Sequence, residues 1–200
     1  MASYKRPDHW TRKAKEEGYA ARAVFKLEEL HQRFPVIPRG TGGAGKGVCV
    51  DLGCFPGSWS KWLLQQGMRV VGVDLKAPDL AGGTWLVASA MEVTAAELVA
   101  AAGAPIDVLV SDMAPNTTGN RFTDHCRQIA LAERALSLAL EVLGPGGAFV
   151  TKVFDGEDAP AFVRKVQTSF HEFKRLKPDA TRDQSVEFFV AGRRPKGVGA

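Results

Sequence analysis

The stretch Val50-Asp-Leu-Gly-Cys-Phe-Pro-Gly-Ser-Trp-Ser60 decides the fold. It has the composition of a short buried strand that ends in a tight turn and leads into a helix. Gly53 and Gly57 let the backbone of this turn approach a ligand closely, and the turn lies at a helix N-terminus. Strand, tight turn and helix form the unit at which doubly wound α/β folds bind nucleotides. We therefore expect a nucleotide-type site here.

The next expected strand, Val70-Val-Gly-Val-Asp74, places a carboxylate 21 residues after Gly53. A carboxylate at about this distance can accept hydrogen bonds from both ribose hydroxyls of an adenosine. A single acid of this kind could also be a helix cap or a turn residue, but the glycine turn before it favours binding. The turn lacks the Gly-x-Gly-x-x-Gly pattern of NAD sites. Asp51 and Pro56 instead indicate a methyltransferase rather than a dehydrogenase.

A second glycine-rich stretch, Gly40 to Lys46, matches most of a phosphate-binding loop. That loop requires Ser or Thr after the lysine, whereas Gly47 follows here. It also follows a strand and opens a helix, whereas this stretch precedes the strand expected at 48–52. The sequence therefore argues against ATP or GTP binding at this position.

Expected strands and helices alternate along the chain. We expect one or two helices over 9–34, helices from the glycine turn to about Gln66 and over 92–102, 121–143 and 159–170, and strands over 48–52, 70–74, 85–87, 106–110, 148–154, 173–177 and 186–191. This alternation predicts a single α/β domain with a largely parallel sheet. The connection Pro178–Ser185 is too short for a crossover helix, so we expect the last two strands to be antiparallel.

Composition and charge narrow the function classes. The 200 residues are 45% hydrophobic and 24% charged, enough for one well-buried domain. No apolar run approaches the roughly 20 residues of a membrane span. Three scattered cysteines and four scattered histidines show no metal-ligand spacing, so we expect no bound metal. Three cysteines cannot form a framework of disulfides, so we expect the protein to lie in the reducing cytoplasm. Residues 1–26 and 164–200 are both basic around an acidic centre, which indicates a polyanion partner, although ordinary solvated faces would give the same pattern.

Five motifs in order closely resemble the FtsJ/RrmJ family of ribosomal RNA large subunit (ribose-2′-O) methyltransferases. They are Gly18-Tyr-Ala-Ala-Arg-Ala-Val-Phe-Lys-Leu27, Asp51–Ser60, Ser111-Asp-Met-Ala-Pro-Asn116, Gly146-Gly-Ala-Phe-Val-Thr-Lys-Val-Phe154, and Lys177-Pro-Asp179 with Glu187. The resemblance implies one Rossmann-like domain that uses S-adenosylmethionine and has a mostly parallel seven-stranded sheet with an antiparallel last strand. The expected divisions are a basic helical segment over 1–34 within the same domain, the methyltransferase domain over 35–192 and a basic tail over 193–200.

The resemblance also assigns site residues. It implies a catalytic set formed by Lys26, Asp112, Lys152 and Glu187. It places cofactor contacts at Gly57, Trp59, Asp74 and Asp112, with Asp51, Gly53 and Ser58 in the same turn. One position departs from the family pattern, because Ser89 occupies the place of an acid that contacts the adenine amino group. A serine oxygen or a backbone carbonyl could accept that hydrogen bond.

The residues themselves support a catalytic Lys152. A lysine inside the apolar run Phe149–Phe154 is costly unless it has a partner or a use, and Asp112 lies at the end of another expected strand. An edge-strand lysine that reaches solvent is the alternative. A ribose hydroxyl is a poor nucleophile until its proton can leave, and an amine can orient the hydroxyl, accept the proton or stabilise the developing alkoxide.

The expected partner is RNA, which shape and phosphate contacts can position without reading base edges. The candidate phosphate contacts are Lys5, Arg6, Arg12, Lys13, Lys15 and Arg22. Family members act on large-subunit ribosomal RNA or on the tRNA anticodon loop, and we favour ribosomal RNA. A catalytically inactive RNA-binding relative is the alternative of another class, although all four catalytic positions are intact. We expect a monomer without membrane attachment.

Overall fold

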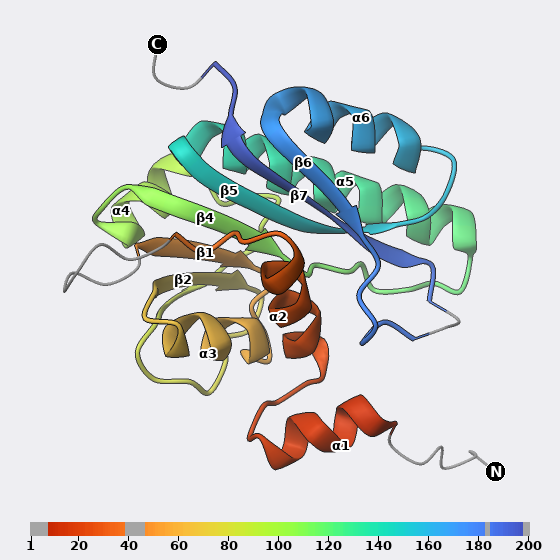
Figure 1. Cartoon of the computed structure of the whole chain (residues 1–200), viewed down its shortest axis with the longest axis horizontal. Coiled ribbons are helices and arrows are strands. Elements are labelled where there is room, and N and C mark those ends of the chain that lie inside the picture. The colour runs from red at the N-terminus through yellow and green to blue at the C-terminus, as the bar shows by residue number, and fades with distance from the viewer. Residues whose placement is uncertain (1–7, 39–46, 183–184, 198–200) are drawn as a thin grey trace.

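The computed structural model describes residues 8–38, 47–182 and 185–197. These residues form one seven-stranded sheet with helices on both faces (Figure 1). The strands are β1 (Val48–Leu52), β2 (Arg69–Asp74), β3 (Thr84–Val87), β4 (Ile106–Ser111), β5 (Leu143–Phe154), β6 (Phe170–Leu176) and β7 (Glu187–Pro195). The expectation of one α/β domain built on seven strands is confirmed.

The strand order is β3-β2-β1-β4-β5-β7-β6. β1 to β5 pair in parallel, whereas β7 is antiparallel to both β5 and β6. The antiparallel last strand is therefore confirmed, but its insertion between β5 and β6 is new. The segment Phe188–Ala191 is buried throughout, as a strand covered on both faces requires.

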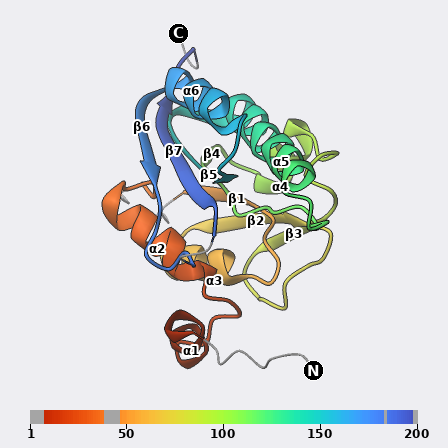
Figure 2. The ribbon, with the colours of Figure 1, turned by 90° about the vertical axis from the view of Figure 1, so that its right-hand side faces the viewer.

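The helices form two layers around the sheet. They are α1 (His9–Glu16), α2 (Ala23–Arg33), α3 (Ser58–Gln65), α4 (Ala95–Ala102), α5 (Arg121–Val142) and α6 (Ala159–Ser169). Figure 2 shows α4, α5 and α6 on one face of the sheet and α2 and α3 on the other. α1 lies outside these layers and contacts α2 through the rings of Trp10 and Phe25, whose centroids are 5.3 Å apart. Each face of the sheet has its own apolar core.

Several element boundaries differ from the sequence prediction, and three of the differences have a visible consequence. α4 begins at Ala95 rather than near Glu92, because the side chain of Thr94 caps it. β5 begins at Leu143, directly after α5, although this strand was expected only from residue 148. β7 continues to Pro195, so the tail expected from residue 193 is wrong for its first three residues. Arg193 is held in the sheet by an ion pair with Glu172.

Candidate active site

The glycine turn follows β1 and is tied to the end of β2. The Gly53 N–H donates to the Val73 carbonyl at 2.8 Å, and the Phe55 N–H donates to Asp74 Oδ2 at 3.0 Å. Gly53 has φ +81°, and a Cβ on it would lie 2.8 Å from Met113 Cγ. Only glycine therefore lets the turn pass this close to the segment after β4.

A cavity of about 340 Å³ opens beside this turn, at the carboxyl ends of the parallel strands. Its lining comprises Gly53, Phe55, Val73, Asp74, Leu75, Ala88, Ser89, Ala90, Asp112, Met113, Ala114 and Leu131. Four predicted cofactor residues, Gly53, Asp74, Ser89 and Asp112, are thus brought together. Sequence analysis missed the apolar lining, because residues such as Leu131 on α5 show only core-like periodicity.

The other predicted cofactor residues lie behind the cavity rather than in its lining. The Ser58 hydroxyl oxygen accepts from the Ala21 N–H at 2.7 Å, and Trp59 Nε1 donates to the Ala23 carbonyl at 2.7 Å. Asp51 is buried and accepts from the Ser60 hydroxyl at 2.6 Å. Gly57, with φ +102°, precedes α3. The hydrogen bonds of Ser58 and Trp59 hold the segment that leads into α2 against α3. Direct contact of Asp51, Gly57, Ser58 and Trp59 with the cofactor remains a prediction.

The cavity fits an adenosine-type cofactor that carries a charged tail. The Phe55 N–H holds the Asp74 carboxylate in the lining of the cavity, where the carboxylate can accept hydrogen bonds from ribose hydroxyls. Asp112 lines the same cavity, and its buried Oδ1 has the Lys152 amine as its nearest partner, at 3.1 Å. Leu75 is 73% exposed beside the cavity and offers an apolar surface for a base.

Lys152 extends from β5 toward Asp112 and is only 6% exposed. Its Nζ donates to the Asp112 backbone carbonyl at 2.7 Å and lies 3.1 Å from Asp112 Oδ1. Gln128 on α5 fixes this part of β5, because Nε2 donates to the Lys152 carbonyl at 2.6 Å and Oε1 accepts from the Phe154 N–H at 2.8 Å. Sequence analysis missed Gln128, although a glutamine on the apolar stripe of a long helix is a detectable signal.

Lys26 and Glu187 form a second buried ion pair in the same region. Lys26 Nζ on α2 donates to Glu187 Oε1 at the start of β7, and both side chains are largely buried. Phe189 pairs in register with Lys152 and lies under Lys26 Nζ, 5.7 Å from its ring centroid. The structure therefore brings the four predicted catalytic residues to one region, at the strand ends on the face that α2 covers.

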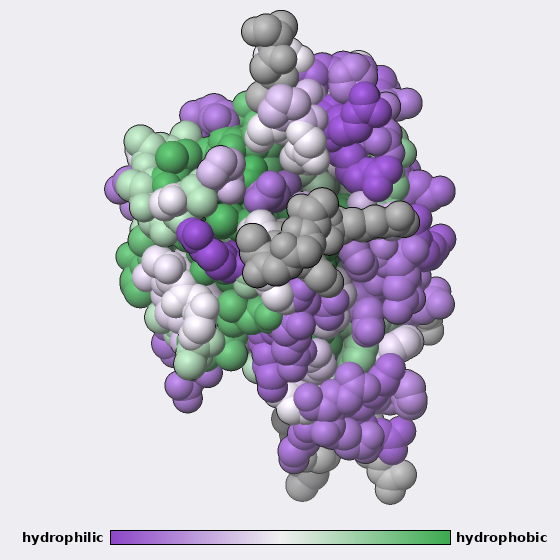
Figure 3. Space-filling view, turned by 60° about the vertical axis from the view of Figure 1, so that its left-hand side comes forward, coloured by the Kyte–Doolittle hydropathy of each residue, from purple (hydrophilic) through white to green (hydrophobic). Residues whose placement is uncertain are grey.

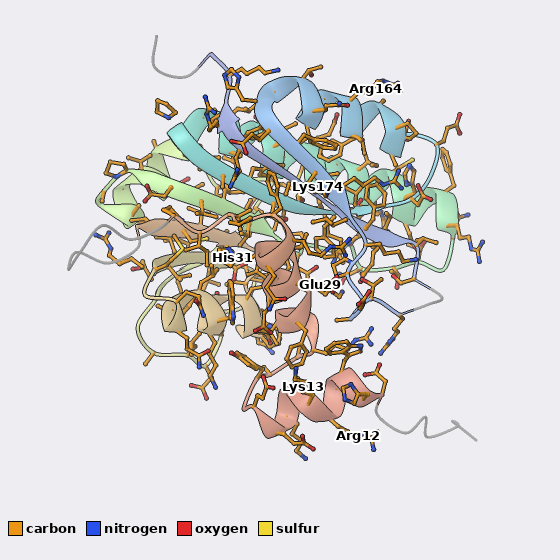
Figure 4. All side chains as sticks on the ribbon, viewed as in Figure 1. Arg12, Lys13, Glu29, His31, Arg164 and Lys174 are labelled. Atoms are coloured by element: carbon orange, nitrogen blue, oxygen red, sulfur yellow. The ribbon has the colours of Figure 1, made fainter. Side chains whose placement is uncertain are left out.

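The basic residues of α1 and its surroundings are only partly available to a ligand. Hydrophilic side chains cover the end of the molecule where α1 lies (Figure 3). Arg12 and Lys13 lie on α1 (Figure 4), and Lys13 Nζ is 4.5 Å from the ring centroid of Phe25. The Arg22 guanidinium is 2.5 Å from Asp8 and has a side chain only 16% exposed, which disfavours its predicted phosphate contact. Lys15 is exposed, whereas Lys5 and Arg6 lie outside the described residues.

Asp51 provides a pH-dependent contribution to stability. Burial raises the pKa of its carboxyl from 3.8 to about 7, against the lowering effect of the Ser60 hydroxyl. Between about pH 4 and 7 the folded state therefore holds a proton that the unfolded state releases. The free energy of unfolding should fall as pH rises through this window, by on the order of 4 kcal/mol in total. Urea denaturation should show this slope in the wild type and lose it in Asp51→Asn; an equal slope in both would contradict the assignment.

The class of protein follows from the sheet order, the antiparallel seventh strand, the glycine turn and the acid at the end of β2. Together they define a Rossmann-like methyltransferase that uses S-adenosylmethionine. The chain belongs to the FtsJ-like methyltransferase family, whose sequence model matches residues 19–194.

Curated relatives and solved structures agree with this placement. "Ribosomal RNA large subunit methyltransferase E" of Desulfatibacillum aliphaticivorans is 43% identical, over 95% of this chain and 91% of that protein. The protein of the same name from Desulfosudis oleivorans is 44% identical, over 94% and 90%. A crystal structure described as a ribosomal RNA methyltransferase from Plasmodium falciparum superposes with a TM-score of 0.73 at 20% identity, over 88% of this chain and 98% of that one, which supports the fold.

The described ranges contain neither a cluster of metal-binding side chains nor a helix suited to cross a membrane. No group of three or more His, Cys, Asp or Glu side chains in this part of the protein is arranged to hold a metal ion. Among the helices described, none is both long and apolar enough to cross a membrane.

Proposed function

We propose that this protein methylates the 2′-oxygen of a ribose in large-subunit ribosomal RNA, and that Lys152 orients or deprotonates the reacting hydroxyl. The observation that carries the proposal is the buried Lys152 amine beside Asp112, a residue that also lines the cofactor cavity. The names of the relatives that are about 40% identical support a ribosomal RNA substrate. We further propose that the protein acts in the cytoplasm as a monomer without a metal ion.

S-adenosylmethionine supplies a methyl group that its sulfonium already activates. Lys152 Nζ lies beside the cavity, where as a neutral amine it can accept the proton of the 2′-hydroxyl, or as an ammonium it can stabilise the oxygen as negative charge develops. Held in the cavity that Asp74 and Asp112 line, this cofactor would supply its methyl group to the ribose oxygen. Asp112 holds the amine of Lys152 in place through its carbonyl and carboxylate.

Lys26 and Glu187 would form the wall of the ribose site on the side of α2. Their ion pair leaves the Lys26 amine over the ring of Phe189, which is the register partner of Lys152. In this position the pair would orient the RNA strand without accepting the proton. The exposed basic residues of α1 would contact RNA phosphates, which need not carry sequence information. The anticodon loop of tRNA is the alternative substrate.

The function is tested by methyl transfer from radiolabelled S-adenosylmethionine to total RNA and to isolated large ribosomal subunits, followed by nucleoside analysis. We expect a 2′-O-methylated nucleoside in large-subunit RNA. Label in the tRNA fraction would favour the alternative substrate, and label on a base would contradict the role of Lys152. If neither RNA accepts a methyl group, an inactive RNA-binding relative is the better interpretation.

A further inference from the structure

A second cavity, of about 410 Å³, opens beside the candidate catalytic residues. It lies where the first turn of α5 meets the segment after β5 and the residue that precedes β7. We name it the α5 pocket and define it by Phe122, His125, Phe154, Asp155, Glu157 and Val186. None of the predicted site residues lines it, so the chemistry described above leaves it unexplained.

The α5 pocket lies next to the proposed ribose site along β5 and β7. Phe154 pairs in register with Glu187, and the Asp155 N–H donates to the Val186 carbonyl at 2.8 Å. Phe154 is two residues beyond Lys152 on β5, a separation of about 7 Å along a strand. A polymer that presents one ribose to Lys152 would therefore bring an adjacent nucleotide over the α5 pocket.

The rim of the α5 pocket is apolar and exposed. Phe122 is 68% exposed and Val186 is 52% exposed, although both are apolar side chains. Exposed aromatic rings beside a nucleic-acid path serve as stacking surfaces for unpaired bases. The apolar rim therefore suits the flat face of a nucleobase, while Arg121 in the same lining can pair with a phosphate of the same strand.

The polar groups of the α5 pocket favour particular bases. Asp155 and Glu157 lie in its lining, and among the described residues the Asp155 carboxylate has one ion pair, an exposed one with Arg175 at 3.6 Å. Carboxylates repel phosphates and accept hydrogen bonds from exocyclic amino groups, as in the pairing of Asp or Glu with cytosine. Cytosine, guanine and adenine carry such an amino group, whereas uracil does not.

The loop that carries these carboxylates is held in place by His125. Its Nε2 accepts from the Asp158 N–H at 3.2 Å, and its side chain is 91% buried. Gly156 packs against the same imidazole, because a Cβ at Gly156 would lie 2.5 Å from His125 Nδ1. The loop after β5 is therefore fixed before any ligand arrives, which lowers the entropy cost of binding.

We propose that the α5 pocket binds one unpaired, amino-bearing nucleobase of the RNA, next to the nucleotide that is methylated. This inference rests on the RNA substrate of the proposed function. Phe122 stacks on the base, and Asp155 and Glu157 accept hydrogen bonds from its amino group. The pocket thereby selects the sequence beside the target ribose.

The test compares the binding of short fluorescent oligo(C) and oligo(U) RNAs by anisotropy. Loss of one stacked base in Phe122→Ala should weaken oligo(C) binding roughly five- to hundredfold, and Phe122→Trp should retain it. Val99→Ala, which removes a 49% exposed apolar side chain from α4, is the control variant and should bind normally. Combining Asp155→Asn with Glu157→Gln should reduce the preference for oligo(C) over oligo(U).

Two binding results would overturn the proposal. One is normal affinity of Phe122→Ala for both RNAs. The other is an equal gain in affinity for both RNAs in the carboxylate variant, which would mean that the carboxylates only repel phosphates. Methyl transfer separates this inference from the proposed function: wild-type ribose methylation with an unchanged KM in Phe122→Ala would retain the function and reject the pocket. Absent methylation would reject the function, while the binding comparison would still decide on the pocket.

Discussion

Lys152→Ala should lower kcat for methyl transfer by about 10²–10⁴, the usual cost of losing a general base or an equivalent stabilising group. The Lys152 amine is buried and fixed 2.7 Å from the Asp112 carbonyl, so water cannot replace it in the same position. Single-turnover transfer from labelled S-adenosylmethionine would measure the effect. Calorimetry should show nearly unchanged cofactor affinity, because the lining of the cofactor cavity does not include Lys152.

Two further lysine variants make this prediction specific. Lys165→Ala removes an exposed lysine on α6 and should leave transfer unchanged. Lys152→Arg keeps a positive charge but cannot lose a proton at neutral pH. Partial activity in Lys152→Arg would therefore indicate stabilisation of the developing alkoxide, and inactivity would fit proton acceptance. Near-normal turnover of Lys152→Ala would reject the role of Lys152 altogether.

The order of elements was predictable from sequence because local patterns encode it. The glycine turn and the acid at Asp74 follow the spacing of a nucleotide-binding unit, and the structure places both beside one cavity. The position of β7 between β5 and β6 was not predictable in this way. It depends on which strands the apolar segment Phe188–Ala191 pairs with, and contacts between residues far apart in the sequence decide this pairing.

The site was predictable only where a residue stood out from its surroundings. Lys152 interrupts an apolar strand, whereas Trp59 occupies a motif position and yet packs its ring 5.9 Å from Phe189. The residues that define the α5 pocket come from three distant segments, and all of them except Phe154 lie outside the family motifs. Their proximity is a consequence of the register between β5 and β7, which sequence patterns do not specify.

Removing one partner of the Lys26–Glu187 pair should lower the free energy of unfolding by about 3–5 kcal/mol, because the other charge is left buried. Their side chains are only 8% and 12% exposed. Urea denaturation of Lys26→Met and of Glu187→Leu would measure the losses. Replacing both residues should recover most of the stability, since two apolar side chains of similar size leave no unpaired charge.

An exposed pair elsewhere in the protein supplies the matched control. Lys165 and Glu133 lie 3.3 Å apart with side chains 56% and 48% exposed, so breaking this pair should cost less than about 1 kcal/mol. Methyl transfer then separates stability from function: the stable Lys26→Met, Glu187→Leu double variant should remain poorly active if the pair positions the ribose. Recovery of both stability and normal turnover would mean that the pair serves folding alone, and that Asp112 and Lys152 are sufficient for the chemistry.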